Sequence, residues 1–173
     1  MAFPTETFYG LGAAALQPAA VRRVFDVKGR PDGKPLLVLV DGVAMAETLA
    51  LDVPAGARAL MARHWPGALT LVLRARPHVP VEVTAGSGTV GVRLSAHPVA
   101  RALVQALGAP VTAPSANPSG LAAPTTAAEV RAHFGDRLDL VLDGGPTAGG
   151  EPSTVLDVTV EPPRVLRAGA VRL

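Results

Sequence analysis

The sequence predicts an α/β protein with a mixed sheet, and three observations lead to this prediction. A length of 173 residues with 49% hydrophobic residues fits one domain with a substantial core. Two uninterrupted apolar runs, Leu36–Val40 and Leu69–Leu73, are typical of buried strands. Helical periodicity alternates with strands that are sometimes isolated and sometimes clustered, which favours a mixed sheet over a strict β–α–β series. We therefore expect a single domain over residues 1–173.

The first predicted helix begins at Pro18, because proline is tolerated at the first helical position. Apolar residues recur at helical spacing until Gly29, which is a stop signal. This helix is expected to deliver Lys28 and Arg30 at its C-terminal end, where both side chains can face a ligand. The preceding segments are expected to be a strand end at 2–5 and a polar, glycine-containing loop at 5–12.

Turn residues divide the rest of the chain into short elements. Helices are expected where apolar residues recur with the helical period between Pro or Gly signals. They are predicted at 44–49, 55–63, 98–107 and 126–134. Strands are expected where β-branched and aliphatic residues cluster between turn residues. They are predicted at 36–40, 69–73, 81–84, 89–94, 110–113, 138–142, 155–160, 165–167 and 170–173.

Composition excludes several classes of protein. The net charge is only +2 and aromatic residues make up 3%, which argues against a basic arm or a stacking platform for nucleic acid. The absence of cysteine excludes disulfides, thiolate catalysis and zinc–sulfur sites. No apolar run approaches the ~20 residues of a membrane helix, and the N-terminus lacks the pattern of a signal peptide. We therefore expect a cytoplasmic protein that does not enter a membrane.

Two familiar site patterns are considered and set aside. The four histidines have no metal-ligand spacing. Gly10-Leu11-Gly12 formally fits a dinucleotide fingerprint, but a polar segment precedes it and Pro18 interrupts the helix that should follow. A nicotinamide-dependent oxidoreductase is therefore the least favoured alternative, and the absence of a thermal shift with NAD would dismiss it.

The lysines indicate a functional loop. Lys28 and Lys34 are the only lysines, and every other basic side chain outside the histidines is arginine. The sequence also has no isoleucine, so its composition is skewed. A lysine that arginine could replace would tend to be lost under such a skew, and the two are not interchangeable at a ligand. The alternative is an ordinary solvated turn rich in Gly and Pro.

Loops that carry hydroxyls and cations suggest a site for a polyphosphate. Thr89 and Arg93 share a predicted strand and on alternation point to one face. Loops after buried strands are where α/β sheets bind ligands, and cations with hydroxyls suit phosphate groups. Each residue also has a local alternative, such as a turn hydrogen bond or a surface ion pair. The candidates are Thr5, Thr7, Tyr9, Lys28, Arg30, Lys34, Thr89, Arg93, Ser115, Asn117, Ser153, Thr154 and Arg167.

Five segments resemble the YrdC-like family, in order over nearly the whole chain: 4–12, 28–36, 115–120, 152–155 and 166–169. The pairing of Lys-x-Arg with Ser-x-Asn is the family's signature, and its best-known members are threonylcarbamoyl-AMP synthases. The resemblance implies a twisted, open mixed sheet with helices and a deep basic cavity. It implies that L-threonine, bicarbonate and ATP give threonylcarbamoyl-AMP and pyrophosphate. The product would pass to a downstream tRNA threonylcarbamoyl transferase.

The resemblance also implies a role for each matching residue. Lys28 and Arg30 would be catalytic, acting at the ATP phosphates and at the carboxylate formed on the amine. The ATP site would comprise Arg30, Lys34, Thr89, Ser115, Asn117 and Arg167. The L-threonine site would comprise Thr7, Arg93 and Ser153. Mg²⁺ would accompany ATP, held by phosphate oxygens and by no ligand from the protein.

Departures from the family leave alternatives open. Relatives usually have a helix and a strand before the segment at Pro4, and many longer ones have histidine at Leu39 and a further C-terminal domain. The resemblance therefore implies a single-domain form in which the N-terminal helix and strand are missing. The alternative is a paralogue that binds RNA or a nucleotide without synthesis, and direct RNA contact is compatible with either. RNA binding predicts steep salt dependence, whereas ATP in a cavity predicts dependence on Arg30 and Ser115.

Overall fold

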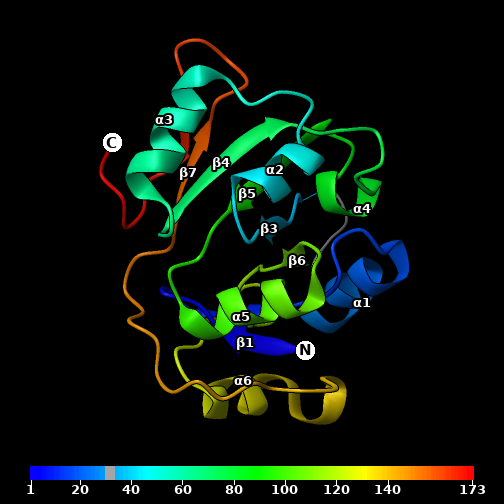
Figure 1. Ribbon diagram of the computed structural model, residues 1–173. Helices are drawn as coiled ribbons and strands as arrows, with labels where there is room; N and C mark the ends of the chain where they lie inside the picture. The colour runs from blue at the N-terminus through cyan, green and yellow to red at the C-terminus, as the bar shows by residue number, and fades with distance from the viewer. Residues whose placement is uncertain (30–33) are drawn as a thin grey trace.

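The computed structural model describes residues 1–29 and 34–173, and a six-stranded mixed sheet organises them (Figure 1). The strand order is β6-β3-β5-β4-β7-β8, in which β3/β5 and β4/β7 are parallel and the other pairs antiparallel. These strands are β3 (Leu37–Leu39), β4 (Leu69–Arg74), β5 (Thr89–Arg93), β6 (Val111–Thr112), β7 (Thr154–Asp157) and β8 (Arg164–Arg167). The predicted mixed sheet is confirmed.

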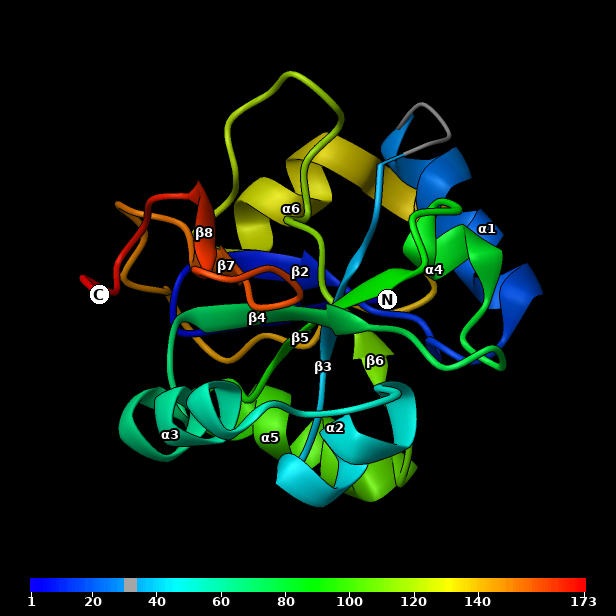
Figure 2. The same ribbon diagram turned by 90° about the horizontal axis from the view of Figure 1, so that it is seen from above.

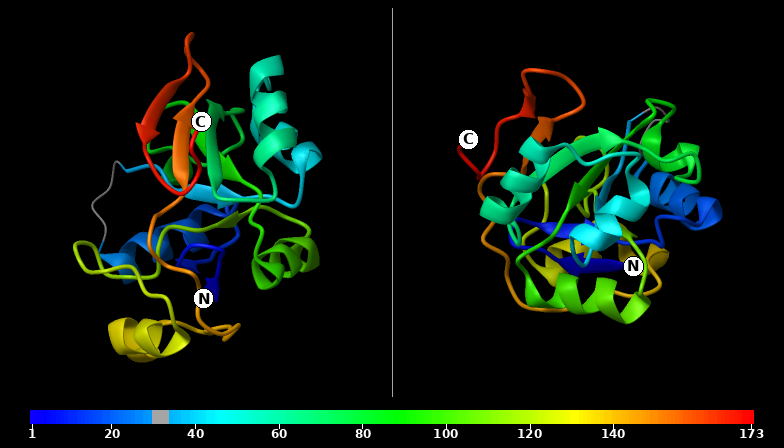
Figure 3. Two further views of the ribbon diagram at one scale, coloured as in Figure 1. Left: turned by 90° about the vertical axis from the view of Figure 1, so that its left-hand side faces the viewer. Right: turned by 45° about the horizontal axis from the view of Figure 1, so that its top comes forward.

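A smaller antiparallel pair, β1 (Ala2–Pro4) and β2 (Tyr9–Leu11), lies with α6 at the end of the molecule opposite β7 and β8 (Figure 3). Viewed from above, α2, α3 and α5 lie on one side of the large sheet, and α1 and α6 lie on the other (Figure 2). The helices are α1 (Pro18–Lys28), α2 (Val43–Leu49), α3 (Ala55–His64), α4 (Val81–Thr84), α5 (Pro98–Leu107) and α6 (Ala127–Phe134), and a 3₁₀ turn follows at Gly135–Arg137.

Local signals explain where the helices begin and end. α1 and α5 each start with proline in the first turn and end at a glycine in the left-handed conformation, Gly29 at φ 59° and Gly108 at φ 63°. α6 begins with a capping box in which Thr126 and Glu129 satisfy each other's backbone N–H groups. In the described part of the chain, no helix combines the length and hydrophobicity that a membrane span requires.

Alternation along β4 separates the core from the opposite face of the sheet. Leu69, Leu71 and Leu73 are fully buried in the same hydrophobic cluster as residues of α2 and α3. Thr70 and Val72 lie between them in the sequence and therefore point to the other face. The prediction that β4 is simply a buried strand was incomplete, because its second face lines a cavity.

The predicted strand at Val81–Thr84 is wrong, because these residues form the short helix α4. The valines favour a strand by propensity, but Pro80 precedes them and its carbonyl accepts the N–H groups of Val83 and Thr84. Val83 is fully buried, and its carbonyl accepts the N–H of Leu36. Tertiary packing therefore overrides the intrinsic preference of this segment.

Three further expectations need correction. Residues Tyr9–Leu11, expected in a loop, form β2 because they pair with β1 and bridge to Ser115. Within 138–142, only Val141 makes a β-bridge, to Ala2, so this segment is not a strand of the sheet. Residues 170–173 form no strand; Val171 is instead tied to Thr154 by two hydrogen bonds.

Candidate functional site

A cavity of about 540 Å³ lies on the face of the sheet opposite α2 and α3. Its wall from β5 comprises Thr89, Gly91 and Arg93, which alternate with the buried residues Val90 and Val92. The other lining residues are Thr5 and 7–10, 35–37, Thr70 and Val72 on β4, 113–115, Ala123, and residues at the start of β7 and the end of β8. This volume is within the range of small-molecule sites. The cavity therefore brings together parts of the chain that are far apart in the sequence.

Eight of the candidate residues line this cavity: Thr5, Thr7, Tyr9, Thr89, Arg93, Ser115, Ser153 and Arg167. Lys28 and Asn117 are buried beside it but do not line it, and Lys34 is exposed. Arg30 lies outside the described residues. Leu39, where longer relatives have histidine, does not line the cavity either; it is fully buried in a second cluster with residues of α5.

The loop between β1 and β2 holds Thr7 in place through a network around Thr5. The Thr5 hydroxyl donates to the Phe8 carbonyl at 2.7 Å and accepts from the backbone N–H groups of Thr7 and Phe8. The two threonine hydroxyls are 3.1 Å apart. This turn chemistry is local, and it fixes the direction in which Thr7 meets the cavity.

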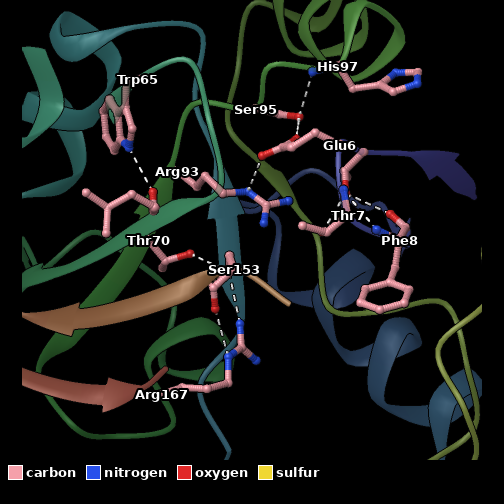
Figure 4. A network of polar contacts seen from close by, with 12 residues as sticks. Glu6, Thr7, Phe8, Trp65, Thr70, Arg93, Ser95, His97, Ser153 and Arg167 are labelled. Atoms are coloured by element: carbon pink, nitrogen blue, oxygen red, sulfur yellow. Dashed lines mark hydrogen bonds and ion pairs between the residues drawn. The ribbon is translucent and has the colours of Figure 1, made fainter. Parts of the chain in front are cut away.

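Ser153 and Arg167 form a second polar group on the opposite wall (Figure 4). Arg167 donates from Nε to the Ser153 carbonyl at 3.0 Å and from Nη2 to its hydroxyl at 2.9 Å. The Ser153 hydroxyl also lies 3.0 Å from that of Thr70 on β4. Burial lowers the pKa of Arg167, but arginine keeps its charge. The serine is therefore held rigidly at the edge of the cavity.

Arg93 is a deeply buried cation of the site, with 3% of its side chain exposed. Burial lowers its pKa, and the nearby carboxylate of Glu6 opposes that shift. The Arg93 Nε and Glu6 Oε1 atoms are 3.6 Å apart, and the Ser95 hydroxyl hydrogen-bonds to Glu6 Oε2 (Figure 4). The sequence interpretation missed Glu6, Ser95 and Thr70. It looked for cations and hydroxyls that a polyphosphate would contact, although Glu6 lies between two threonines that it did select.

The Lys28 side chain does not point into the open cavity. Its ammonium donates to the Ser115 carbonyl at 2.6 Å and the Asn117 carbonyl at 2.7 Å, with the Asn117 Oδ1 atom at 3.2 Å. Asn117 in turn donates from Nδ2 to the carbonyls of Pro118 and Leu121. The expectation that Lys28 simply projects from a helix end is therefore wrong, because its charge holds the loop that contains the Ser-x-Asn pair.

The charges favour an anionic ligand. Two guanidinium groups, those of Arg93 and Arg167, line the cavity, and its described lining residues include no carboxylate. Thr7, Ser115 and Ser153 line the same cavity, and the Ser153 hydroxyl accepts a hydrogen bond from Arg167. Among residues 1–29 and 34–173, no group of three or more His, Cys, Asp or Glu side chains is placed to hold a metal.

Comparison with known proteins identifies a family and several relatives that match nearly the whole chain. Residues 1–169 match the model of the Sua5/YciO/YrdC family, which is described as telomere recombination. A threonylcarbamoyl-AMP synthase of Pyrococcus abyssi is 46% identical over 173 residues, which cover 100% of this chain and 51% of that protein. A threonylcarbamoyl-AMP synthase of Bacillus subtilis is 45% identical over 172 residues, covering 99% and 50%, respectively.

A solved structure is also closely similar. The crystal structure of P. abyssi Sua5 complexed with L-threonine superposes with a TM-score of 0.95 at 46% identity. The match covers 97% of this chain and 49% of that one. The chain thus spans about half the length of each of these relatives.

Proposed function

Because this chain belongs to the Sua5/YciO/YrdC family, we propose that it synthesises threonylcarbamoyl-AMP from L-threonine, bicarbonate and ATP, with release of pyrophosphate. The observation that carries this proposal is the cavity itself, which is lined by the buried Arg93, by Arg167 at its edge, and by threonine and serine residues. An amino acid and a nucleotide both present anionic groups that such a lining can bind. The similarity to a Sua5 structure with L-threonine supports the amino-acid substrate.

In this proposal, Thr7, Arg93 and Ser153 bind L-threonine. Arg93 is suited to the carboxylate, because a guanidinium can donate two parallel hydrogen bonds to it. The hydroxyls of Thr7 and Ser153 are suited to the amino-acid hydroxyl. A site of this kind rejects valine strongly, because buried polar groups would be left unpaired, but it distinguishes serine only by one methyl group.

The ATP site in this proposal comprises Arg30, Lys34, Thr89, Ser115, Asn117 and Arg167. The amine of threonine reacts with bicarbonate to give a carbamate and water, and a carbamate oxygen then attacks the α-phosphorus as pyrophosphate leaves. Such a transfer needs alignment of the reactants and neutralisation of charge more than a protein nucleophile. Mg²⁺, bound through phosphate oxygens, would supply part of that neutralisation.

Lys28 would contribute by fixing the Ser115–Asn117 loop under the nucleotide, while Arg30 would act on the phosphates directly. The role of Arg30 depends on the Lys-x-Arg pattern alone, since it lies outside the described residues. The product would serve a downstream tRNA threonylcarbamoyl transferase. Binding of RNA or nucleotide without synthesis is the less favoured alternative, because the relatives named above are synthases.

The deciding experiment is to measure pyrophosphate release from ATP with and without L-threonine and bicarbonate. We expect release only when both co-substrates are present. Arg167→Ala should reduce the rate by about a hundredfold or more, because it removes a preorganised charge from the site. Arg101→Ala, on the exposed face of α5, is the matched control and should match the unaltered protein. A folded protein that binds ATP but releases no pyrophosphate would overturn the proposal.

A further inference from the structure

A carboxylate to which the proposed chemistry assigns no role lies behind the cavity. Glu6 does not line the cavity, yet its Oε1 atom is 3.6 Å from Nε of the buried Arg93. Both of these atoms are buried without a hydrogen-bond partner among the described residues. Their contact is therefore a charge pair rather than a hydrogen bond, and a small rotation of either side chain would close it.

Glu6 is itself held by the segment between β5 and α5. The Ser95 hydroxyl donates to its Oε2 atom and accepts the backbone N–H of His97 at 3.2 Å. Ser95 is two residues beyond Arg93, the last residue of β5, and is only 1% exposed. The segment that precedes α5 thus holds a carboxylate that belongs to the loop after β1. The hydrogen bond at Oε2 leaves Oε1 as the carboxylate atom that faces Nε of Arg93.

In this arrangement, the terminal nitrogens of Arg93 remain available for a ligand. Its Nε edge faces Glu6, and its two terminal nitrogens donate no hydrogen bond to any residue in the described part of the chain. Arg93 nevertheless lines the cavity. A guanidinium fixed at Nε presents its terminal nitrogens as a planar pair, which is the geometry that a carboxylate or phosphate accepts.

We propose that Glu6, held by Ser95, is a positioning residue that fixes Arg93 so that its terminal nitrogens receive the carboxylate of the ligand. The identity of that ligand as L-threonine rests on the proposed function; the positioning itself does not. Without the carboxylate, Arg93 keeps its charge but loses the partner that opposes its burial, and it turns toward other acceptors. The cavity then still contains the Arg93 cation, but the guanidinium group is no longer held in one orientation.

The test is the variant Glu6→Gln, which preserves size and removes charge. Glu47→Gln is the matched control, because Glu47 forms an exposed ion pair with Arg58. Titration calorimetry should show L-threonine affinity reduced by between about tenfold and a hundredfold in Glu6→Gln, because the binding group is misplaced. Affinity for ATP and for L-threoninol, which lacks the carboxylate, should change by less than about twofold. The Glu6→Gln Arg93→Lys double variant should bind L-threonine no more weakly than Arg93→Lys alone.

A second readout needs no ligand. The Arg93 Nε–H signal in an NMR spectrum, assigned by its loss in Arg93→Lys, should be protected from exchange in the unaltered protein and lose that protection in Glu6→Gln. Ser95→Ala should shift both readouts in the same direction, which covers the case in which Glu6→Gln does not fold. Unchanged protection, or equal losses for L-threonine and ATP, would refute positioning. An unaltered protein that binds no L-threonine would refute the proposed function instead, while the NMR comparison would still decide the role of Glu6.

Discussion

Lys28 shows how one side chain can serve a site without lining it. Only 5% of the residue is exposed, and its ammonium group donates hydrogen bonds to oxygen atoms of Ser115 and Asn117. A compact ammonium, for which the two retained lysines suggest a need, fits this geometry. A planar guanidinium could not fit the same set of acceptors, because its donors lie in one plane.

Replacing Lys28 should therefore lower the stability of the protein as well as its affinity for ATP. In Lys28→Met, the two carbonyls at 2.6 and 2.7 Å lose their donor. We expect the free energy of unfolding in urea to fall by about 2–4 kcal/mol, since each buried unsatisfied group costs about 1–3 kcal/mol. Lys34→Met, at an exposed lysine, should change it by less than about 0.5 kcal/mol.

Lys28→Arg is the sharper comparison because it keeps the charge. We expect it to lose at least half of the stability that Lys28→Met loses, and to bind ATP more weakly than the unaltered protein because the Ser115–Asn117 loop is displaced. A Lys28→Arg protein with unaltered stability and ATP affinity would show that the shape of the ammonium is irrelevant at this position.

At the scale of elements, the N-terminus of α5 links the site to a titrating group. His97 is the N-cap, and its Nδ1 atom accepts the backbone N–H of Val99 at 3.2 Å. Only the neutral imidazole has this acceptor. Burial lowers the pKa of His97 below its ordinary value of 6.5, and the charge of Glu6 opposes the shift without reversing it.

The sign of the pH dependence follows from this lowered pKa. The unfolded chain binds a proton at His97 near pH 6.5, whereas the folded protein binds it only at lower pH. The contribution of His97 to stability is therefore complete above pH 6.5 and is lost as the pH falls through the folded pKa. Urea unfolding followed over about pH 5 to 8, the range in which histidine titrates, should show this loss.

The variant His97→Asn distinguishes the role of His97 as an N-cap from the effect of its protonation. Asparagine is a good N-cap and does not titrate, so this variant should keep the helix and lose the part of the pH dependence that His97 causes. His97→Ala should be less stable by about 1 kcal/mol at neutral pH, because it removes the cap. A His97→Asn protein with the pH profile of the unaltered chain would rule out His97 as the source.

Elements with strong local signals could be predicted from the sequence, and those fixed by tertiary contacts could not. Proline and glycine marked both ends of α1 and α5, and those helices are confirmed. In α4, β-branched residues suggested a strand, but buried Val83 and the preceding proline decided the outcome. Glu6 was missed for a related reason, since its importance depends on Arg93, a residue far along the chain that only the fold brings near.

At the scale of the whole molecule, the cavity joins the two ends of the chain. Thr7 and Arg167 line the same space, and the Gly149 N–H donates to the Thr7 carbonyl at 2.8 Å. The site is thus complete only when β7 and β8 have packed onto the sheet that β3, β4 and β5 form. Ligand binding and the packing of the C-terminal strands should therefore be coupled.

Gly169 offers a test of this coupling because it touches the segment that carries Ser153. A Cβ atom at Gly169 would lie 2.2 Å from the Pro152 carbonyl oxygen and 2.7 Å from the backbone nitrogen of Thr154, so the backbone would have to move. Gly169→Ala should lower the free energy of unfolding by about 1–3 kcal/mol, the usual cost of overpacking. It should also weaken L-threonine binding, because Ser153 and its bond to Arg167 would shift.

Gly56→Ala, in the first turn of α3, is the opposite case, since a Cβ there meets no atom within 4 Å. It should raise stability by about 0.4–1 kcal/mol, through a less flexible unfolded chain, and leave L-threonine affinity unchanged. Urea unfolding and calorimetry on both variants give the comparison. If Gly169→Ala lost stability but bound L-threonine like Gly56→Ala, the C-terminal strands would support the sheet without setting the geometry of the cavity, and Ser153 would have no part in the amino-acid site.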